Sequence, residues 1–423
     1  MNTFLRLAAL IFAALSASTH AHASTEADET VDFLIDAMRQ YYVIPENGER
    51  AAVGIENARD SGALEGLEES ELAAALTRLV HEHTDDVHFS LRHAPPREES
   101  STLARRVIDR SLSHGFTSVR WLTGDVACVE LESFESSPQA VAHADALMQN
   151  INGAGAIIFD LRRNGGGSPD VISAITAHLF ETPVLFNTLI DREGDVEQEV
   201  WSGDAPGAPP IPDTPVFILT SAYTFSAAES FTYGLQARGR AVVVGEPTGG
   251  GAHMVMSRRL DHGFHINMPG RRARNPITGT NWEGVGVQPD IHTLPDDALR
   301  RAHLEAIRLQ IRSDDPARAA LARWALPALQ AAADGFDPDA VSTEGLAGVY
   351  GPYQVEERNG ALHLRRAPAG WRRLYPLTDQ WYGVSETDTT VYYGFERTRV
   401  GEARAILTSQ PGRDVRRTLR DEE

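Results

Sequence analysis

A serine at the start of an expected helix is the residue best placed to act as a nucleophile. The apolar segment Val216–Thr220 is typical of a buried strand, and Ser226 then precedes the small residues Ala227 and Ala228. Most serines in this position only cap a helix. The position also suits a nucleophile, because a helix N-terminus favours developing negative charge and the N–H of Ala227 can face the reacting oxygen. Glu229, one helical turn on, either lines such a site or completes a capping box.

Three consecutive glycines could supply further hydrogen-bond donors to the same oxygen. The apolar segment Ala156–Leu161 runs into polar residues and then into the glycines 165–167, after which a helix pattern begins. Glycines let the backbone turn sharply and leave N–H groups directed at a bound group, as an oxyanion hole requires. Nucleotide-binding turns and purely structural turns share this pattern, although the glycine spacing matches neither phosphate-binding motif. Taken alone, the turn leaves these roles open.

Histidine and acidic residues offer a possible base and a carboxylate to orient it. Asp86 and His88 stand in a polar run after a helical segment, and Glu283 lies in a glycine-containing segment. A lone histidine is more often a surface or structural residue, and Glu283 taken alone is as readily a solvated turn residue. His83 and His88 suggest a metal site, but their spacing matches no metal-binding helix pattern, so we expect no metal. The competing histidines in or near the core are His81, His83, His93, His253, His262 and His265.

Composition excludes several kinds of chemistry. All 39 residues of the Lys+Arg count are arginine, so no lysine can act as a base, form a Schiff base or bind a phosphate. Cys128 is the only cysteine and lies in an apolar run typical of a buried strand, which excludes an intrachain disulfide and a cysteine-based metal cluster. The formal net charge of −20 argues against nucleic acid or an anionic membrane as a partner, because both need a basic surface.

The N-terminus predicts export. Arg6 precedes an apolar stretch over residues 7–17, and the tripeptide 21–23 forms a small-x-small cleavage site before Ser24. The apolar stretch is too short to span a membrane comfortably, and no second one of that length follows. We therefore expect a signal peptide over residues 1–23 and a mature protein, without a membrane span, that is periplasmic or secreted.

Alternating strand and helix patterns must position the candidate residues. Between about residues 115 and 292, short apolar runs alternate with helical stretches, which favours an α/β core with a largely parallel sheet. The expected strands are Phe116–Trp121, Val126–Leu131, Ala156–Leu161, Val184–Leu189, Val216–Thr220 and Ala241–Gly245, with further β-like segments at Gly263–Pro269 and Val285–Ile291. The expected helices are Ala140–Ile151, Pro169–Phe180 and Ala227–Ala237.

Further regions flank this core, which we expect over residues 94–295 with a linker at 94–102. Apolar residues at helical spacing predict an N-terminal helical cap over residues 24–93. The helical pattern returns in a connector over residues 296–338. Short strands separated by glycine-containing turns then predict a small antiparallel β-domain over residues 339–423.

Four motifs in order resemble those of the S41 peptidases, the tail-specific (carboxyl-terminal processing) and tricorn-core proteases. They are Asp160–Gly167, Thr220–Glu229, Gly245–Gly250 and Glu283–Asp290, within a similar stretch of roughly residues 85–292. The resemblance implies an α/β fold with a ββα core related to that of crotonases and Clp proteases. It also implies that Ser226 is the nucleophile and that a peptide or unfolded protein is the substrate, with no cofactor.

One departure from the family pattern bears on the mechanism. Carboxyl-terminal processing peptidases typically carry a lysine after the GEP motif, where this chain has Gly251, so a Ser–Lys dyad is impossible. The chain also leaves no room for the PDZ domain that those proteases usually carry. The tricorn-like and retinoid-binding-protein-like branch instead has a histidine in a D-x-H setting and a downstream glutamate. His88, preceded by Asp86, and Glu283 match both features.

The resemblance therefore implies a serine, histidine and glutamate mechanism. His88 takes the proton from Ser226, and Glu283 orients His88 and stabilises its imidazolium form. The backbone donors of the implied oxyanion hole are those of Gly165, Gly166 and Ala227.

Two other functions are compatible with such a core. Retinoid-binding relatives use it as an apolar carrier, so the alternative to a peptidase is a non-catalytic binder of apolar ligands or peptides. The complete set of Ser226, His88 and Glu283 favours the peptidase, because a binder has no need of it. A crotonase-type acyl-CoA enzyme would share the oxyanion hole, but coenzyme A is cytoplasmic and the signal peptide argues against it. The sequence sets no oligomeric state.

Overall fold

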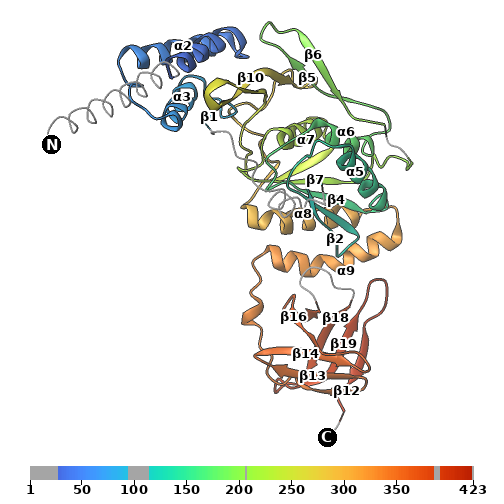
Figure 1. The fold of residues 1–423 in the computed structure, drawn as a ribbon. Coiled ribbons are helices and arrows are strands. Elements are labelled where there is room, and N and C mark those ends of the chain that lie inside the picture. Colours follow the sequence, from blue (N-terminus) through green and yellow to red (C-terminus); the bar gives the residue numbers. More distant parts are fainter. Residues whose placement is uncertain (1–26, 94–113, 205–206, 385–390, 422–423) are drawn as a thin grey trace, which may run out of the picture.

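The structure is a computed structural model that describes residues 27–93, 114–204, 207–384 and 391–421. N-terminal helices, a central α/β region and a C-terminal β region follow one another along the molecule (Figure 1). The predicted signal peptide (1–23) and linker (94–102) lie outside the described residues. Within the described part of the chain, no helix has the length and apolar character needed to cross a bilayer.

A six-stranded mixed sheet forms the centre of the molecule. Its strands are, in spatial order, β11 (Ile291–His292), β8 (Ala241–Gly245), β7 (Val216–Thr220), β4 (Ala156–Asp160), β3 (Val126–Leu131) and β2 (Phe116–Leu122). All neighbours pair in parallel except β2, which joins β3 antiparallel at one edge. The predicted alternation of strands and helices is confirmed, and the ends of β2, β3, β4, β7 and β8 lie within one residue of those expected.

Helices cover both faces of this sheet, which explains why its central strands are continuously apolar. Along β4, Ile157 and Phe159 belong to one apolar cluster and Ile158 belongs to another, because alternate side chains point to opposite faces. The first cluster includes residues of α5 (Pro138–Asn150), α6 (Pro169–Ala177) and α7 (Ala227–Gln236). The second includes residues of α8 (Pro295–Gln310) and α9 (Pro316–Ala333).

A second sheet lies beside the first and was predicted only in part. It consists of β1 (Ser90–His93), β10 (Phe264–Arg274), β5 (Leu185–Ile190) and β6 (Val196–Trp201) in that order, with β9 (His253–Arg259) also paired to β10. The sequence analysis did not predict β6 or β9. Both strands are largely exposed, and their apolar residues do not alternate as in a half-buried strand.

The β-like segment expected at Val285–Ile291 is wrong except for its last residue. Residues 283–285 form a turn, and only Ile291–His292 pairs as a strand. Gly284 and Gly286 have φ angles of 71° and 69°, outside the extended region. A side chain at Gly286 would also lie 2.2 Å from the carbonyl oxygen of Thr248. The turn thus requires glycine, and it fixes the position of Glu283.

The N-terminal helices form their own core and connect directly to the second sheet. A helix with described residues 27–41, α2 (Pro45–Asp60) and α3 (Glu69–Thr84) share an apolar cluster with Phe89 of the following loop and Phe264 of β10. After α3 the chain turns at Asp85, whose φ is 56°, a left-handed conformation that aspartate tolerates better than most residues. This turn directs residues 86–89 towards β1.

The C-terminal region consists of antiparallel sheets, as predicted. One sheet contains β12 (Gly348–Tyr350), β13 (Tyr353–Arg358), β14 (Ala361–Arg366) and β15 (Arg372–Arg373). The other contains β16 (Tyr375–Pro376), β17 (Trp381–Gly383), β18 (Tyr392–Arg397), β19 (Ala403–Ser409) and β20 (Arg416–Leu419). Trp324 of α9 stacks on Tyr392 with ring centroids 3.9 Å apart, which joins this region to the connector helices.

Candidate active site

Ser226 occupies a strained turn between β7 and α7. Its φ of 56° and ψ of −118° are rare for a residue with a side chain, and such strain persists only where neighbouring contacts enforce it. The N–H of Ser226 is donated to Glu229 Oε2 at 2.8 Å, and the N–H of Phe225 to the carbonyl of Asn164 at 3.0 Å. A strained strand-to-helix turn is how several hydrolases present a nucleophilic serine to the substrate.

Glu229 is a buried anchor for the loop next to Ser226. Its side chain is fully buried and accepts four hydrogen bonds, from the N–H groups of Ser226, Gly250 and Gly251 and from the hydroxyl of Thr248, at 2.5–2.8 Å. Burial raises the pKa of the carboxyl, although these hydrogen bonds oppose the shift. Glu229 is not among the residues that line the pocket at Ser226, so it positions the loop from behind.

The glycine turn packs directly on Ser226. Gly166 has a φ of 106°, and a side chain there would lie 2.9 Å from the Cβ of Ser226. A side chain at Gly167, with φ 140°, would lie 1.9 Å from the carbonyl oxygen of Phe134. The N–H of Gly166 is donated to Asn164 Oδ1 at 2.8 Å and is therefore not available to an oxyanion in this conformation. Gly167 and Ala227 line the pocket, whereas Gly165 does not.

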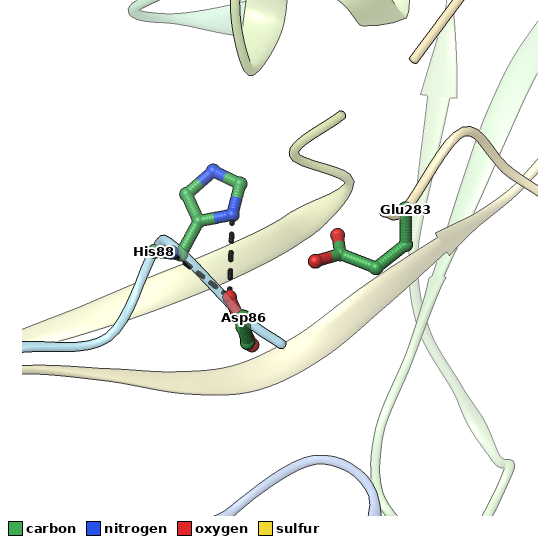
Figure 2. Close-up of side chains that lie close together, drawn as sticks. All are labelled: Asp86, His88 and Glu283. Carbon is green, nitrogen blue, oxygen red and sulfur yellow. Dashed lines mark hydrogen bonds and ion pairs between the residues drawn. The ribbon is translucent and has the colours of Figure 1, made fainter. Parts of the chain in front are cut away.

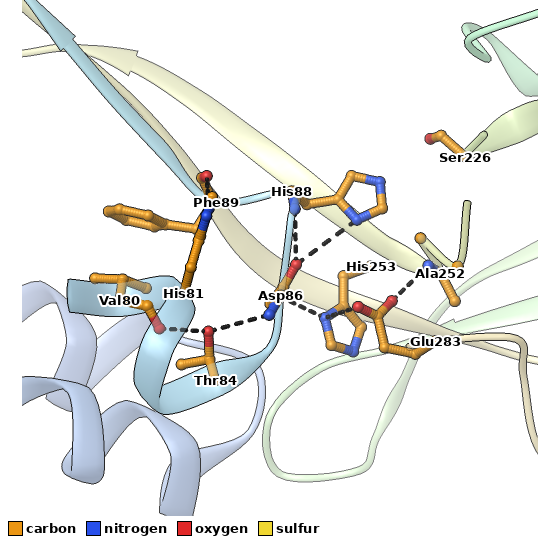
Figure 3. Close-up of polar contacts among 12 residues, drawn as sticks. Val80, His81, Thr84, Asp86, His88, Phe89, Ser226, Ala252, His253 and Glu283 are labelled. Atoms are coloured by element: carbon orange, nitrogen blue, oxygen red, sulfur yellow. Dashed lines mark hydrogen bonds and ion pairs between the residues drawn. The ribbon is translucent and has the colours of Figure 1, made fainter. Parts of the chain in front are cut away.

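His88 lies in the same pocket as Ser226. Its side chain is only 7% exposed and its ring packs against Phe225, with centroids 4.5 Å apart. Neither ring nitrogen has a hydrogen-bond partner among the described residues. Nδ1 lies 3.7 Å from Asp86 Oδ1, and the other ring nitrogen is on the side of Ser226 (Figure 3). Burial lowers the pKa of His88 to about 4 against the opposing charge of Asp86, so the ring is neutral at pH 7.

Asp86 is the carboxylate most closely associated with His88. It is 1% exposed and accepts the backbone N–H of His88 at 2.9 Å. Its other oxygen lies 2.7 Å from both the hydroxyl of Tyr42 and Nδ1 of His253. Burial acts to raise the pKa of Asp86, but the contacts with His253 and Tyr42 outweigh it, and the pKa is lowered. Asp86 is thus an ionised acid held between two histidines.

Glu283 lies near this group without bonding to His88. Its Oε2 accepts the N–H of Ala252 at 2.5 Å, while Oε1 has no hydrogen-bond partner among the described residues and lies 3.7 Å from Nδ1 of His253. One carboxylate oxygen of Asp86, one of Glu283 and a ring nitrogen of His88 all lie within 4.8 Å of one another. Figure 2 shows the three side chains. Burial, together with the charge of Asp86, raises the pKa of Glu283 to about 7.

The structure separates the competing histidines. His253 lines the pocket and contacts Asp86, so it belongs to the site. His81 bonds to the carbonyl of Phe89, and His93 to that of His262, and none of these three histidines lines the pocket. The sequence analysis named His253 only as a competing base and Asp86 only as part of the D-x-H pattern, and it did not predict that the two side chains contact each other. The D-x-H pattern was a signal for Asp86, but no local pattern marks His253.

Comparison with known proteins identifies the class of the central region. Residues 125–293 match the model of peptidase family S41. Carboxyl-terminal-processing peptidase 2, chloroplastic, from Arabidopsis thaliana is 28% identical over 172 residues, which are 40% of this chain and 32% of that protein. Residues 125–293 are therefore similar to peptidase family S41, a family of serine-type hydrolases. The chain matches about a third of the length of this curated relative.

Solved structures of similar overall shape include two proteases. The photosystem II D1 C-terminal processing protease is 14% identical, with a TM-score of 0.46, and the match covers 68% of this chain and 98% of that one. The tricorn protease is 14% identical, with a TM-score of 0.45, and the match covers 66% of this chain and 36% of that one. The family match includes Ser226 and Glu283 but begins after His88.

Proposed function

We propose that this protein is an exported serine peptidase that hydrolyses peptide bonds through an acyl-enzyme, with Ser226 as nucleophile and His88 as base. The observation that supports it most is the strained Ser226 in one pocket with a buried imidazole whose ring nitrogens have no hydrogen-bond partner among the described residues. A base must be unprotonated to accept a proton, and a lowered pKa keeps His88 in that form. The similarity of the central region to family S41 supports the same chemistry.

The reaction follows from this pair. His88 accepts the hydroxyl proton of Ser226 as the serine oxygen attacks the substrate carbonyl carbon. The imidazolium then gives that proton to the leaving amine as the carbon–nitrogen bond breaks, which leaves an ester on Ser226. A water molecule attacks the ester, again with His88 accepting its proton, and the carboxylic product leaves as Ser226 recovers its hydrogen.

Two carboxylates can stabilise the imidazolium form of His88. Asp86 is ionised, lies 3.7 Å from Nδ1 and also fixes the backbone of His88. Glu283 is the residue that the family resemblance implies in this role. Its carboxylate lies within 4.8 Å of a ring nitrogen of His88, but its contacts are with His253 and the backbone of Ala252. We therefore propose that Asp86 is the main orienting carboxylate and that Glu283 acts mostly through His253.

Backbone donors for the oxyanion are proposed at Ala227 and Gly167. Both line the pocket beside Ser226, and the turn that contains Gly167 packs against Ser226. The resemblance implied Gly165, Gly166 and Ala227 as donors. The N–H of Gly166 is already donated to Asn164 and Gly165 does not line the pocket, so we do not propose these two glycines as donors. The relation of the core to the ββα units of crotonases and Clp proteases stays a prediction.

Gly251 supports a histidine rather than a lysine as the base. A Cβ at residue 251 would lie 2.3 Å from Cε1 of His88 and 2.2 Å from Cζ of Phe225. The imidazole thus fills the space into which a side chain at this position would extend. The position of the His88 ring consequently requires glycine at residue 251, because the ring occupies the space that a Cβ at residue 251 would need.

A fluorophosphonate probe tests the nucleophile directly, because it phosphonylates activated serines. We expect the wild-type protein to be labelled and Ser226→Ala to be unlabelled, with intact-mass analysis placing the adduct on Ser226. Labelling that persists in Ser226→Ala would overturn the assignment. An unlabelled wild-type protein that binds apolar ligands or peptides without cleaving them would support the carrier function instead.

Export rests on the predicted signal peptide and is tested separately. We expect the mature protein to begin near Ser24 and to be recovered from the periplasm or the medium. N-terminal sequencing of the protein from fractionated cells measures both. An uncleaved N-terminus in the cytoplasmic fraction would contradict export without affecting the proposed chemistry.

A further inference from the structure

The pocket at Ser226 contains a second polar feature that the proposed mechanism does not use. Asn187, on β5, lines the pocket and is only 1% exposed. Its Nδ2 donates to Oγ of Ser230 at 2.7 Å, while its Oδ1 has no hydrogen-bond partner among the described residues. Buried amide oxygens are nearly always bonded, so an unpartnered one in the wall of a pocket indicates a bonding position that a ligand can fill.

The two elements that carry this pair place it close to the nucleophile. Ser230 lies one helical turn after Ser226 on α7, which separates their backbones by roughly 5 Å along the helix axis. On β5, alternate residues face the same side, and Leu189 accordingly lines the pocket together with Asn187. A substrate side chain that enters this pocket next to Ser226 would therefore reach Asn187 if it is a long side chain.

The remainder of the pocket is apolar and uncharged. It has a volume of about 350 Å³, and among the described residues that line it there is no aspartate, glutamate or arginine. Its only titratable residues are His88 and His253, which belong to the catalytic group. A charged substrate side chain would lose its hydration there without gaining a counter-ion, which is strongly unfavourable. The apolar residues of the wall include Ile172, Leu189, Val200, Met254, Ala273 and Trp282.

We propose that this pocket selects the substrate side chain next to the scissile bond, and that it takes an uncharged side chain with an apolar body ending in a hydroxyl or carboxamide. The proposal rests on the peptidase function proposed above. The substrate group donates a hydrogen bond to Asn187 Oδ1. The hydroxyl of Ser230, which accepts from Asn187, keeps its own hydrogen for a second bond to the same group. Tyrosine and glutamine combine suitable length with these properties.

Matched peptides test this selection. Each pair differs only in the polar end of one side chain, tyrosine against phenylalanine and glutamine against methionine, with lysine against methionine as the charge control. The varied residue is placed on either side of the cleaved bond in separate series, and kcat/KM is measured for each peptide. We expect the polar member of at least one pair to be preferred about 10-fold or more, because unfilled polar groups in a site penalise the apolar analogue. Lysine should be the poorest substrate.

Two substitutions at Asn187 make the test specific. Asn187→Leu, close in shape but without polar atoms, should remove or reverse the preference. Asn187→Asp should raise the lysine-to-methionine ratio about 10-fold or more by supplying a counter-ion. Gln198→Leu, the same kind of change at an exposed position on neighbouring β6, is the control and should alter neither ratio.

The outcomes separate this inference from the proposed function. If no peptide is cleaved and the wild-type protein is not labelled, the peptidase function fails. If peptides are cleaved but the apolar member is preferred in every pair, or if Asn187→Leu leaves the ratios unchanged, the selection inference is overturned while the peptidase function stands.

Discussion

The two halves of the candidate site are built in different ways. The nucleophile half, Ser226 with the glycine turn and Glu229, comes from consecutive strand–turn–helix units inside the segment that matches family S41. The base half, Asp86 and His88, comes from the loop after α3, outside that segment. It reaches the site only because β1 pairs with β10 and the N-terminal helices share a core with that strand.

This difference indicates that the nucleophile half is held rigidly by local contacts and that the base half depends on contacts between distant segments. Glu229 accepts one hydrogen bond from the N–H of Ser226 and three from residues 248–251 of the neighbouring loop, so it holds the two segments together within one compact region. His88 has no hydrogen bond to either ring nitrogen among the described residues, and its position depends on Phe225, Gly251 and Asp86. Substitutions in the first half should therefore act mainly on the chemistry of the serine, and those in the second on the placement of the base.

The largest effect is expected where the two halves meet in one chemical step. Ser226→Ala and His88→Ala should each lower kcat by at least about 10³-fold, and the double variant should be little worse than either. Peptide cleavage under single-turnover conditions measures this, with thermal unfolding as a check on the fold. Effects that multiply in the double variant would show that the two residues do not act as a unit.

The second prediction compares the two carboxylates of the base half. Asp86→Asn should lower kcat/KM by about 10²–10⁴-fold, because it removes the negative charge next to His88 and leaves the orientation of the ring unsupported. Glu283→Gln should cost only about 10-fold, since its side chain contacts His253 rather than His88. A larger loss for Glu283→Gln would restore Glu283 as the residue that orients His88.

The third prediction concerns Gly251, where the halves touch. Gly251→Ala should lower kcat/KM by about 10²-fold, because the added methyl group would lie 2.3 Å from His88 and displace the ring from Ser226. Labelling of Ser226 should fall in parallel. Gly153→Ala is a suitable control, since nothing lies within 4 Å of a Cβ at that position and its φ is not in the left-handed region. Full activity in Gly251→Ala would show that His88 is not held where the structure has it.

The fourth prediction tests how the N-terminal helices influence the base. Tyr42→Phe removes the hydroxyl that donates to the buried Asp86 at 2.7 Å. The expected costs are about 1.5–3 kcal/mol in the free energy of unfolding, the usual effect of a hydrogen bond to a charged group, and about 3–10-fold in kcat/KM. Tyr41→Phe, at an exposed neighbouring position, should change neither quantity. A loss of stability alone would confine Tyr42 to a structural role.

The smallest expected effect is a displacement of the pH profile. Because burial lowers the pKa of His88 to about 4 from an ordinary 6.5, the base stays unprotonated as the pH falls and is lost only near pH 4. The pH profile is best measured in the variant Glu283→Gln. This variant lacks the carboxyl of Glu283, whose pKa near 7 would otherwise add its own titration to the profile. In this variant the acid limb of kcat/KM should fall near pH 4. A limb near pH 6.5 would show that His88 is more hydrated than the structure indicates.

Much of the fold and half of the site were predictable from local patterns. The inner strands β4, β7 and β8 of the central sheet are mainly apolar runs, and its helices begin after residues such as Ser137 and Ser168, whose side chains cap them. The exposed strands β6 and β9 were not predictable, because pairing with neighbouring strands decides them rather than apolar spacing. The turn after Trp282 was not predictable, because the φ angles of its glycines decide it. The contact between Asp86 and His253 was missed because it depends on packing between distant segments.

The sequence by itself determined that no lysine can serve Ser226 and that the serine stands at the start of a helix beside a glycine-rich turn. Both are properties of residue type and of neighbours along the chain. Only the tertiary structure decided which ionisable side chains surround His88. Asp86, His253 and Glu283 are far apart in sequence and meet because the loop after α3, strand β9 and the turn after Trp282 converge. Long-range packing, which local periodicity does not encode, sets those distances.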